Sequence, residues 1–155
     1  LFAILPLPIQ FMGKAELTKI PLFGYFFKEN SVIVNRKNLK NSYEAFQESA
    51  KKLNNGLSMC IFPEGGIPHK NTRLKKFKNG PFKLAYEKKI KIIPITIADN
   101  KKIFPKNYYE GKPGIVRVKI HKPIIIQKES DNNIEYLNNS VYNIIFDQLK
   151  KYESN

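Results

Sequence analysis

The 155-residue sequence has one cysteine, Cys60, and no apolar run of the length that a membrane-spanning helix needs. A single cysteine cannot form an internal disulfide, and Cys60 lies in an apolar segment, so the sequence favours a reducing compartment and a packing role for its thiol. Spanning a bilayer takes roughly 18 apolar residues. Residues 1–8 are too few, are interrupted by proline and lack the basic start of a signal peptide. Within these 155 residues, a disulfide scaffold and a membrane-spanning helix are therefore excluded.

Sequence signatures of several common catalytic and binding sites are also missing. The sequence has neither the Gly-x-Ser-x-Gly turn of serine hydrolases nor the glycine patterns that bind nucleotides. Its two histidines, His69 and His121, have Leu74 and Ile126 five residues on instead of an aspartate, and no cluster of His and Cys has metal-ligand spacing. We therefore expect no metal site, no cofactor, a surface position for His69 and a structural role for His121.

Acidic residues are few. The sequence has 13 Asp and Glu against 27 Lys and Arg, which leaves a formal net charge of +14. This balance argues for an anionic partner, whether nucleic acid, an anionic lipid surface or a phosphorylated substrate, and charge alone does not choose among them. With 42% apolar and 12% aromatic residues, a chain of this length can bury one continuous core. The sequence therefore predicts one globular domain with a basic surface.

The order of apolar segments predicts an α/β fold. Apolar and β-branched runs predict strands at residues 9–12, 31–34, 57–62, 92–97 and 115–120. Helical periodicity or a leading proline predicts helices at residues 22–27, 43–53, 80–89 and 134–149. Asn41 and Glu44 are expected to cap the second helix, Gly56 to end it, and Pro94 to mark a strand end, edge or bulge. Strands that alternate with helices indicate a mainly parallel central sheet flanked by helices.

The segment Ser-Met-Cys-Ile-Phe-Pro-Glu-Gly-Gly at residues 58–66 is the strongest indication of a functional site. It predicts a buried strand that ends in a tight turn and presents the carboxylate of Glu64, while the two glycines let a ligand approach the main chain. Six cations and no acid follow between residues 70 and 83: Lys70, Arg73, Lys75, Lys76, Lys78 and Lys83. Cations and free N–H groups at a strand exit suit a phosphate. The alternative interpretation is a plain turn with a solvated glutamate and a solvated basic loop.

Several segments, in this order, resemble the glycerolipid acyltransferase family and specifically its 1-acyl-sn-glycerol-3-phosphate acyltransferases. They are Phe-Met-Gly-Lys-Ala-Glu-Leu at 11–17 with Pro-Leu-Phe-Gly at 21–24, Val-Ile-Val-Asn-Arg at 32–36, Ile-Phe-Pro-Glu-Gly at 61–65 and Ile-Pro-Ile-Thr at 93–96. Residues 77–85 also resemble the segment after the family's Pro-Glu-Gly turn. The resemblance covers most of residues 9–125 and implies the glycerol-3-phosphate acyltransferase-like form of the α/β fold.

The resemblance implies a reaction. In this family, acyl-CoA or acyl-carrier protein gives an acyl group to the sn-2 hydroxyl of 1-acylglycerol-3-phosphate (lysophosphatidic acid), which makes phosphatidic acid in phospholipid biosynthesis. The histidine of a His-x-x-x-x-Asp box acts as the general base, a contribution of about 10²–10⁴-fold. That box precedes the segment with Lys14, and the chain begins too late to include it. We therefore expect one acyltransferase domain, residues 1–155, that lacks its amino-terminal part, has no catalytic residue of its own and is inactive or nearly so by itself.

The resemblance also implies substrate-binding residues. Lys14 and Arg36 match positions that bind phosphate, and a guanidinium fork suits a phosphomonoester. Glu64 and Gly65 match the turn of the acceptor site, and Gly66 follows them as a further expected substrate-binding residue. There the carboxylate positions a glycerol hydroxyl or a neighbouring cation, and the glycines let the backbone approach the phosphate.

One departure from the family's pattern affects the phosphate site. The family commonly continues its Glu-Gly turn with Thr-Arg, whereas Gly66 and Ile67 follow here, so the expected arginine is missing from its place. We expect Arg73 or Lys78 to reach the phosphate instead.

Lipid partners would explain the positive charge. The expected partners are lysophosphatidic acid, acyl-CoA or acyl-carrier protein, and an anionic membrane surface at the cytoplasmic face, where a basic face and apolar residues dock. Residues 22–27 have more aromatic side chains than one buried face can hold, so lipid or an acyl chain is a candidate contact for some of them, with core packing as the commoner alternative. The main alternative, a basic nucleic-acid-binding domain, explains the charge but not the ordered segments, and no nucleic-acid motif is visible. Another acceptor, such as a lyso-aminolipid or a glycerol phosphate, remains open.

Overall fold

The computed structural model describes residues 4–5, 8–34, 39–69, 71–105, 108–126 and 133–154, and it describes only the backbone of residues 39–43 and 108. The chain forms two compact units, Leu1–Phe62 and Pro63–Asn155. Each unit has its own sheet, helices and core. The expectation of a single acyltransferase domain over residues 1–155 stays a prediction.

The first unit is built on a three-stranded parallel sheet. β1 (Ile9–Lys14) lies between β2 (Ser31–Val34) and β3 (Ser58–Cys60), so the strand order is β2-β1-β3. Phe11 pairs with Ser31 on one side and with Cys60 on the other. The predicted α/β class with a mainly parallel sheet is therefore confirmed. β3 ends two residues before the predicted strand end, a difference that is common at the ends of elements.

Helices make the crossovers that parallel strands require. They are η1 (Ala15–Lys19) and α1 (Phe23–Glu29) between β1 and β2, and α2 (Leu39–Asn54) between β2 and β3. The predicted cap of Asn41 and Glu44 is wrong, because α2 begins before Asn41 and a capping residue must have a non-helical backbone. The predicted end of α2 is confirmed: Gly56 has φ of +79°, and its N–H donates to the Leu53 carbonyl at 3.0 Å.

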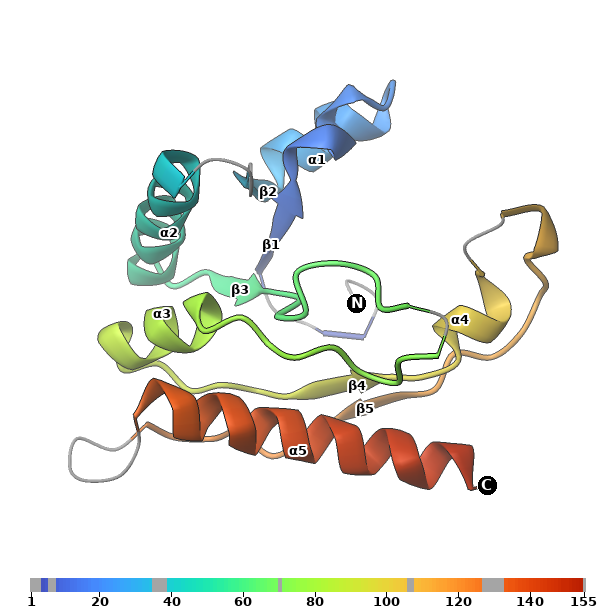
Figure 1. The fold of residues 1–155 in the computed structure, drawn as a ribbon. Coiled ribbons are helices and arrows are strands. Elements are labelled where there is room, and N and C mark those ends of the chain that lie inside the picture. Colours follow the sequence, from blue (N-terminus) through green and yellow to red (C-terminus); the bar gives the residue numbers. More distant parts are fainter. Residues whose placement is uncertain are drawn as a thin grey trace. The chain divides into compact units, whose positions relative to one another are not determined.

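The core of the first unit lies between the sheet and α2, which packs on β2 and β3 (Figure 1). Val32, Val34 and Ala45 are buried there, and Met12 and Met59 pack against them. The neighbouring Cys60 is half-buried, and burial raises the pKa of its thiol. The predicted buried packing role of this residue stays a prediction, because its side chain is only partly buried.

The second unit begins with a long loop and continues with helices and an antiparallel strand pair. Its elements are α3 (Gly80–Lys88), β4 (Ile95–Ile97), α4 (Asn100–Ile103), η2 (Tyr108–Glu110), β5 (Val118–Ile120) and α5 (Ile134–Glu153). β4 pairs with β5, and Thr96 lies opposite Lys119. β4 begins after Pro94, as the proline indicated, and Ile92 makes an isolated bridge to Ile124. Residues before and after Pro94 therefore both pair with the segment 118–124, which is the partner of the predicted 92–97 strand on both sides of the proline.

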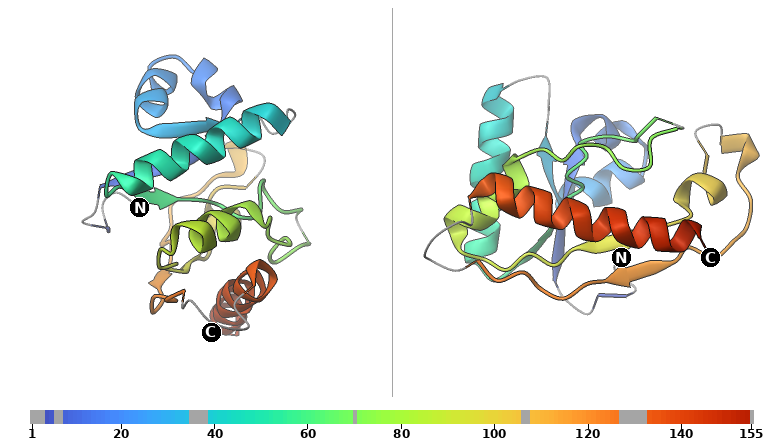
Figure 2. Two further views of the ribbon diagram at one scale, coloured as in Figure 1. Left: turned by 90° about the vertical axis from the view of Figure 1, so that its left-hand side faces the viewer. Right: turned by 60° about the horizontal axis from the view of Figure 1, so that its bottom comes forward.

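The long helix α5 provides one wall of the second core. It lies alongside α3 and β4 (Figures 1 and 2). Phe82 of α3 and Leu137 and Val141 of α5 are buried together. In the predicted apolar face of α5, Leu137 and Val141 are buried, and the other members are half-buried: Ile134, Ile144, Ile145 and Leu149. The polar Gln148 is buried as well. Among the described residues, none of the helices has the length and apolar character needed to cross a membrane.

Candidate functional site

Lys14 lies at the carboxyl-terminal edge of the first unit's sheet. It is the last residue of β1, its side chain is exposed, and it pairs in register with Val34, the last residue of β2. Parallel strands put their carboxyl ends at one edge of a sheet, which is where ligands of open α/β folds bind. Arg36 stands two residues after Val34 and lies outside the described residues. The register thus brings Val34, the last described residue before Arg36, to the edge that carries Lys14.

The Glu64 carboxylate is bound by the main chain of its own loop. Glu64 is half-buried, and its Oε2 accepts a hydrogen bond from the backbone N–H of Lys75 at 2.9 Å. Gly65 has φ of +69°, a conformation that costs glycine little and other residues more. The interpretation of Glu64 as a merely solvated residue is therefore wrong, because a backbone donor eleven residues away holds one of its oxygens.

A cation lies beside the second glycine of this turn. A Cβ added to Gly66 would come to 3.6 Å from Nζ of Lys75, which is an ordinary contact. Packing would therefore tolerate a side chain at position 66. The glycine that is there leaves the Lys75 ammonium next to main chain without a side chain. Main chain without a Cβ beside an ammonium group is suited to an anionic ligand.

The loop from residue 63 to residue 79, which we call the 63–79 loop, is closed at its base. The N–H of Lys78 donates to the Pro63 carbonyl at 2.8 Å, and that of Thr72 donates to the His69 carbonyl at 2.9 Å. The Lys78 side chain is exposed. Lys78 thus contributes its backbone to the closure of the loop and leaves its ammonium available to solvent.

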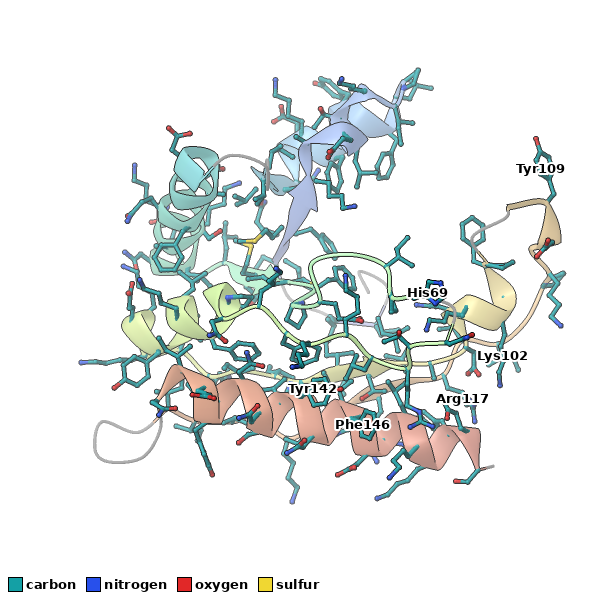
Figure 3. All side chains as sticks on the ribbon, viewed as in Figure 1. His69, Lys102, Tyr109, Arg117, Tyr142 and Phe146 are labelled. Carbon is teal, nitrogen blue, oxygen red and sulfur yellow. The ribbon has the colours of Figure 1, made fainter. Side chains whose placement is uncertain are left out.

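Arg73 connects the 63–79 loop to α5. Its Nε and Nη2 donate to Oε2 of Glu153 at 2.9 and 2.5 Å, and its guanidinium lies 5.2 Å from the centroid of the Phe146 ring. Hydrogen bonding to Arg73 is the main reason why the pKa of Glu153 is lowered. Figure 3 shows Phe146 and Tyr142 on the same helix, and the Tyr142 hydroxyl donates to the Leu74 carbonyl at 3.5 Å.

Two further side chains hold the 63–79 loop in place. Lys101 of α4 donates from Nζ to the carbonyls of His69 and Thr72. Asn138 of α5 donates from Nδ2 to the Phe77 carbonyl at 3.2 Å and to Oδ1 of Asn79 at 2.6 Å. The loop therefore has contacts with two helices besides its own internal bonds. Sequence reasoning missed Lys101, Asn138 and Glu153, since each is distant in sequence and no local pattern marks it.

The predicted run of six cations does not act as one cluster. Lys70 lies outside the described residues. Arg73 is paired with Glu153, and Lys83 forms an ion pair with Glu87 at 3.8 Å on the surface of α3. The members of the run that remain as candidate phosphate ligands are Lys75, Lys76 and Lys78.

A second polar cluster lies at the carboxyl-terminal end of α5, where Glu153 also lies. Asp99, at the start of α4, accepts hydrogen bonds from Nε and Nη2 of Arg117 at 2.7 and 2.9 Å. These bonds are the main cause that lowers the pKa of Asp99 to about 2. Arg117 also stacks over the Tyr152 ring, 4.6 Å from its centroid, near the end of α5 (Figure 3). The cluster connects the start of α4, the residue before β5 and the end of α5, so its contacts indicate a structural role.

The two histidines have the positions predicted for them. His69 is exposed in the 63–79 loop (Figure 3). Nε2 of His121 lies 2.8 Å from the hydroxyl of Thr96, a fully buried residue of β4. The pKa of His121 is lowered mainly by burial and secondly by the charge of the nearby Lys119.

Across the described part of the chain, no three His, Cys, Asp or Glu residues come together as a metal site would require.

Curated relatives of this chain share one activity in their names. The chain is 33% identical over 118 residues to the chloroplastic 1-acyl-sn-glycerol-3-phosphate acyltransferase of Arabidopsis thaliana, a match that covers 74% of this chain and 33% of the relative. It is 29% identical over 145 residues to the 1-acyl-sn-glycerol-3-phosphate acyltransferase of Borreliella burgdorferi, which covers 93% of this chain and 56% of the relative. The chain thus spans between a third and just over half of the length of these relatives.

A solved structure has the same fold. The 1-acyl-sn-glycerophosphate (LPA) acyltransferase PlsC of Thermotoga maritima matches with a TM-score of 0.76 and 24% identity, over 94% of this chain and 57% of that chain. At this level of identity the likeness establishes the fold alone. It confirms the glycerol-3-phosphate acyltransferase-like form of the α/β fold.

The family model described as Acyltransferase matches residues 1–98. The matched region contains the whole first unit, the 63–79 loop, α3 and β4. It therefore includes both the sheet edge with Lys14 and the turn with Glu64. The chain belongs to the acyltransferase family.

Proposed function

We propose that the protein transfers an acyl group from acyl-CoA or acyl-carrier protein to the sn-2 hydroxyl of 1-acylglycerol-3-phosphate and so makes phosphatidic acid. The observation that carries the proposal is the 63–79 loop, in which the main chain binds the Glu64 carboxylate beside the left-handed Gly65. Such a loop presents an oriented carboxylate and an accessible backbone to a polar, phosphorylated acceptor. The names of the curated relatives support the choice of acceptor.

The chemistry requires a base and a properly placed acceptor. The base removes the proton of the acceptor hydroxyl, whose oxygen attacks the carbonyl carbon of the thioester. The carbon–sulfur bond then breaks, and the departing thiolate takes up a proton. The family resemblance gives the base to the histidine of a His-x-x-x-x-Asp box, a pattern that these 155 residues do not contain. The residues of this chain bind and orient the acceptor in this scheme.

Each part of the acceptor is assigned to a different kind of group. Its phosphate goes to cationic side chains, and its glycerol to the glycine turn. The proposed phosphate ligands are Lys14, Arg36 and Lys78, with Lys75 and Lys76 as the other candidates in the loop, and the turn residues are Glu64, Gly65 and Gly66. Arg73 already binds Glu153 through two of its three guanidinium nitrogens, so a phosphate ligand would compete with Glu153 or use the remaining N–H donors.

Lipid surfaces are the proposed site of action. The acceptor and the product are anionic lipids, and the chain carries a net charge of +14, so we place the protein on an anionic membrane surface at the cytoplasmic face. No metal or organic cofactor enters the scheme. Nucleic acid is not proposed as a partner, because only the charge favours it.

The test is acyl transfer by the whole protein with three acceptors: lysophosphatidic acid, a lyso-aminolipid and glycerol 3-phosphate. We expect lysophosphatidic acid to have the highest kcat/KM. Glu64→Gln keeps the shape and removes the charge, and it should lower kcat/KM by about tenfold or more, as loss of a charge-assisted contact does. Arg36→Ala should raise the acceptor KM more than Arg36→Lys does.

Controls separate the site from general charge effects. Lys122→Ala removes an exposed cation outside the 63–79 loop and should leave the acceptor KM unchanged. If Arg73→Ala also leaves it unchanged, Arg73 is not a phosphate ligand. A higher kcat/KM with another acceptor would contradict the choice of lysophosphatidic acid, and no transfer to any of the three would contradict the proposed reaction.

A further inference from the structure

α1 and the residues just before it expose an unusual number of large apolar side chains. We call Ile20, Leu22, Phe23, Tyr25 and Phe26 the α1 face. Leu22 is 83% exposed, Tyr25 70% and Phe26 64%, and the other two are about half exposed. Leu22 directly precedes the helix, and the rings of Tyr25 and Phe26 within it lie edge to face, with centroids 5.6 Å apart. Contiguous apolar patches on a surface mark interaction sites more often than scattered single residues do.

The opposite side of α1 is packed so closely that the helix cannot rotate to bury this face. A Cβ on Gly24 would overlap the backbone carbonyl of Thr18, and one on Gly13 of β1 would overlap the ring of Phe27. Phe27 also stacks on Phe23 with centroids 5.3 Å apart. Two glycines therefore let η1 and β1 approach α1, and this approach sets which side chains point outward.

Backbone strain accompanies the outward position of Leu22. This residue has φ of +59° and ψ of −56°, a region that a bulky side chain rarely adopts and that costs of the order of a hydrogen bond or more. Because its side chain is the most exposed of the α1 face, packing within the described residues does not compensate that cost. Strained residues of this kind tend to occur where the surroundings or a partner require them.

Charge and size indicate which partner fits. Lys19 and Lys28 are exposed on either side of the α1 face, Glu29 follows Lys28, and the chain as a whole carries +14. Aromatic and aliphatic side chains flanked by lysines are typical of segments that lie in the interface of an anionic bilayer. A fully buried aromatic side chain covers about 150–250 Å². Five partly exposed side chains thus offer less than the roughly 800 Å² per partner of a stable protein interface.

We propose that the α1 face inserts into the surface of a bilayer that contains anionic lipid and so docks the protein there. This inference rests on the proposed function in one respect: an enzyme whose acceptor is a lipid must reach the bilayer. It goes further by naming the side chains that enter it, with Lys19 and Lys28 at the level of the headgroups.

The experiment measures binding of the full chain to vesicles of phosphatidylcholine, with and without phosphatidylglycerol, by flotation. The double variant Tyr25→Ser/Phe26→Ser should bind the anionic vesicles at least about tenfold more weakly, since two large apolar side chains no longer enter the lipid. The matched control is Tyr109→Ser. Tyr109 is 99% exposed on η2, points away from α4 in Figure 3 and lies outside the α1 face, so its variant should bind as the parent does.

Leu22→Gly separates docking from damage to the fold. Glycine adopts positive φ without strain, so this variant should unfold at a temperature equal to or above that of the parent. It should nevertheless bind vesicles more weakly, because the most exposed apolar side chain is gone. A misfolded protein would show the opposite thermal behaviour.

Binding is measured without acyl transfer, so failure of this inference differs from failure of the proposed function. Equal vesicle binding by the parent, Leu22→Gly and the double variant would overturn the inference, as would no binding by the parent. If the same variants instead abolish self-association in sedimentation velocity and leave vesicle binding unchanged, the α1 face binds a second copy and the inference is wrong. If Tyr109→Ser weakens vesicle binding as much as the double variant does, the inference is likewise wrong.

Discussion

Arg73 and Glu153 stand 80 residues apart in sequence and join the 63–79 loop to the last turn of α5. Two of the three guanidinium nitrogens, Nε and Nη2, bind one carboxylate oxygen, and the Phe146 ring lies against the same guanidinium. The loop that carries Glu64 is therefore anchored by the end of the chain's final helix. Since the family model covers residues 1–98, this anchor comes from a part of the chain outside the matched region.

The variant Glu153→Gln should loosen the 63–79 loop without unfolding the protein. Exposed ion pairs add little to global stability, whereas loss of an anchor raises local opening. We expect faster amide hydrogen exchange in residues 63–79, measured by mass spectrometry, and a melting temperature close to that of the parent. Glu135→Gln removes the same charge from the first turn of α5 and serves as the control. Equal exchange of the loop in the two variants would show that Glu153 does not anchor it.

Much of the fold could be predicted because its determinants are local. The β-branched run at residues 31–34 is β2, Gly56 ends α2 in the left-handed conformation, and the apolar stripe of residues 134–149 lies on the core side of α5. The parallel order of the first sheet followed from the alternation of strands and helices. The start of α2 was missed, because Asn41 is a good capping residue by type and only the backbone shows that the helix begins earlier.

The contacts of the candidate site could be predicted only in part. Glu64 and its glycines were visible as a motif, yet nothing in the sequence indicates that the backbone of Lys75 binds that carboxylate. Arg73 and Lys78 were equivalent candidates for the missing arginine. Tertiary structure distinguishes them, since Arg73 pairs with Glu153 and Lys78 closes the base of the loop through its backbone. Interactions over such sequence distances leave no periodic signal.

Low pH should destabilise the protein partly because the Asp99 carboxylate becomes protonated. Arg117 lowers the pKa of this carboxyl from 3.8 to about 2 in the folded protein. The unfolded chain therefore takes up the proton more readily, so the stabilisation is complete above about pH 4 and is lost as the pH falls towards about 2. Asparagine also tolerates the left-handed backbone that Asp99 has, with φ of +68°, and it carries no charge.

The corresponding measurement is the melting temperature of parent and Asp99→Asn between about pH 5 and 2. The parent should lose more of its melting temperature in this range than the variant does. Glu87→Gln is the control, because the Lys83–Glu87 pair is exposed and loosely spaced at 3.8 Å. Parallel melting curves for parent and Asp99→Asn would contradict the role assigned to Arg117.

The close approach of α1 and η1 predicts that Gly24→Ala is strongly destabilising. The new Cβ would overlap a backbone carbonyl, that of Thr18, which cannot move aside as a flexible side chain would. We expect a loss of about 1–3 kcal/mol in the free energy of unfolding, measured by urea titration. Gly80→Ala, at the start of α3, is the control: a Cβ there meets nothing within 4 Å, so stability should be unchanged or slightly higher. Similar losses in the two variants would mean that α1 does not pack on η1 in this way.

His121 should titrate below its ordinary pKa of 6.5, because burial and then the charge of Lys119 disfavour its protonated form. A lowered pKa on a base means that the folded state resists protonation more than the unfolded state does. Stability is therefore retained above about pH 6.5 and decreases as the pH falls below it. The imidazole carbon protons of His121 in NMR spectra would report the titration midpoint directly, and a midpoint at or above 6.5 would contradict this prediction.

Two variants separate the contacts of His121. Thr96→Val removes the buried hydroxyl that contacts Nε2 and should cost about 1 kcal/mol of unfolding free energy. Lys119→Gln removes the nearby charge and should raise the His121 midpoint only in part, since burial remains.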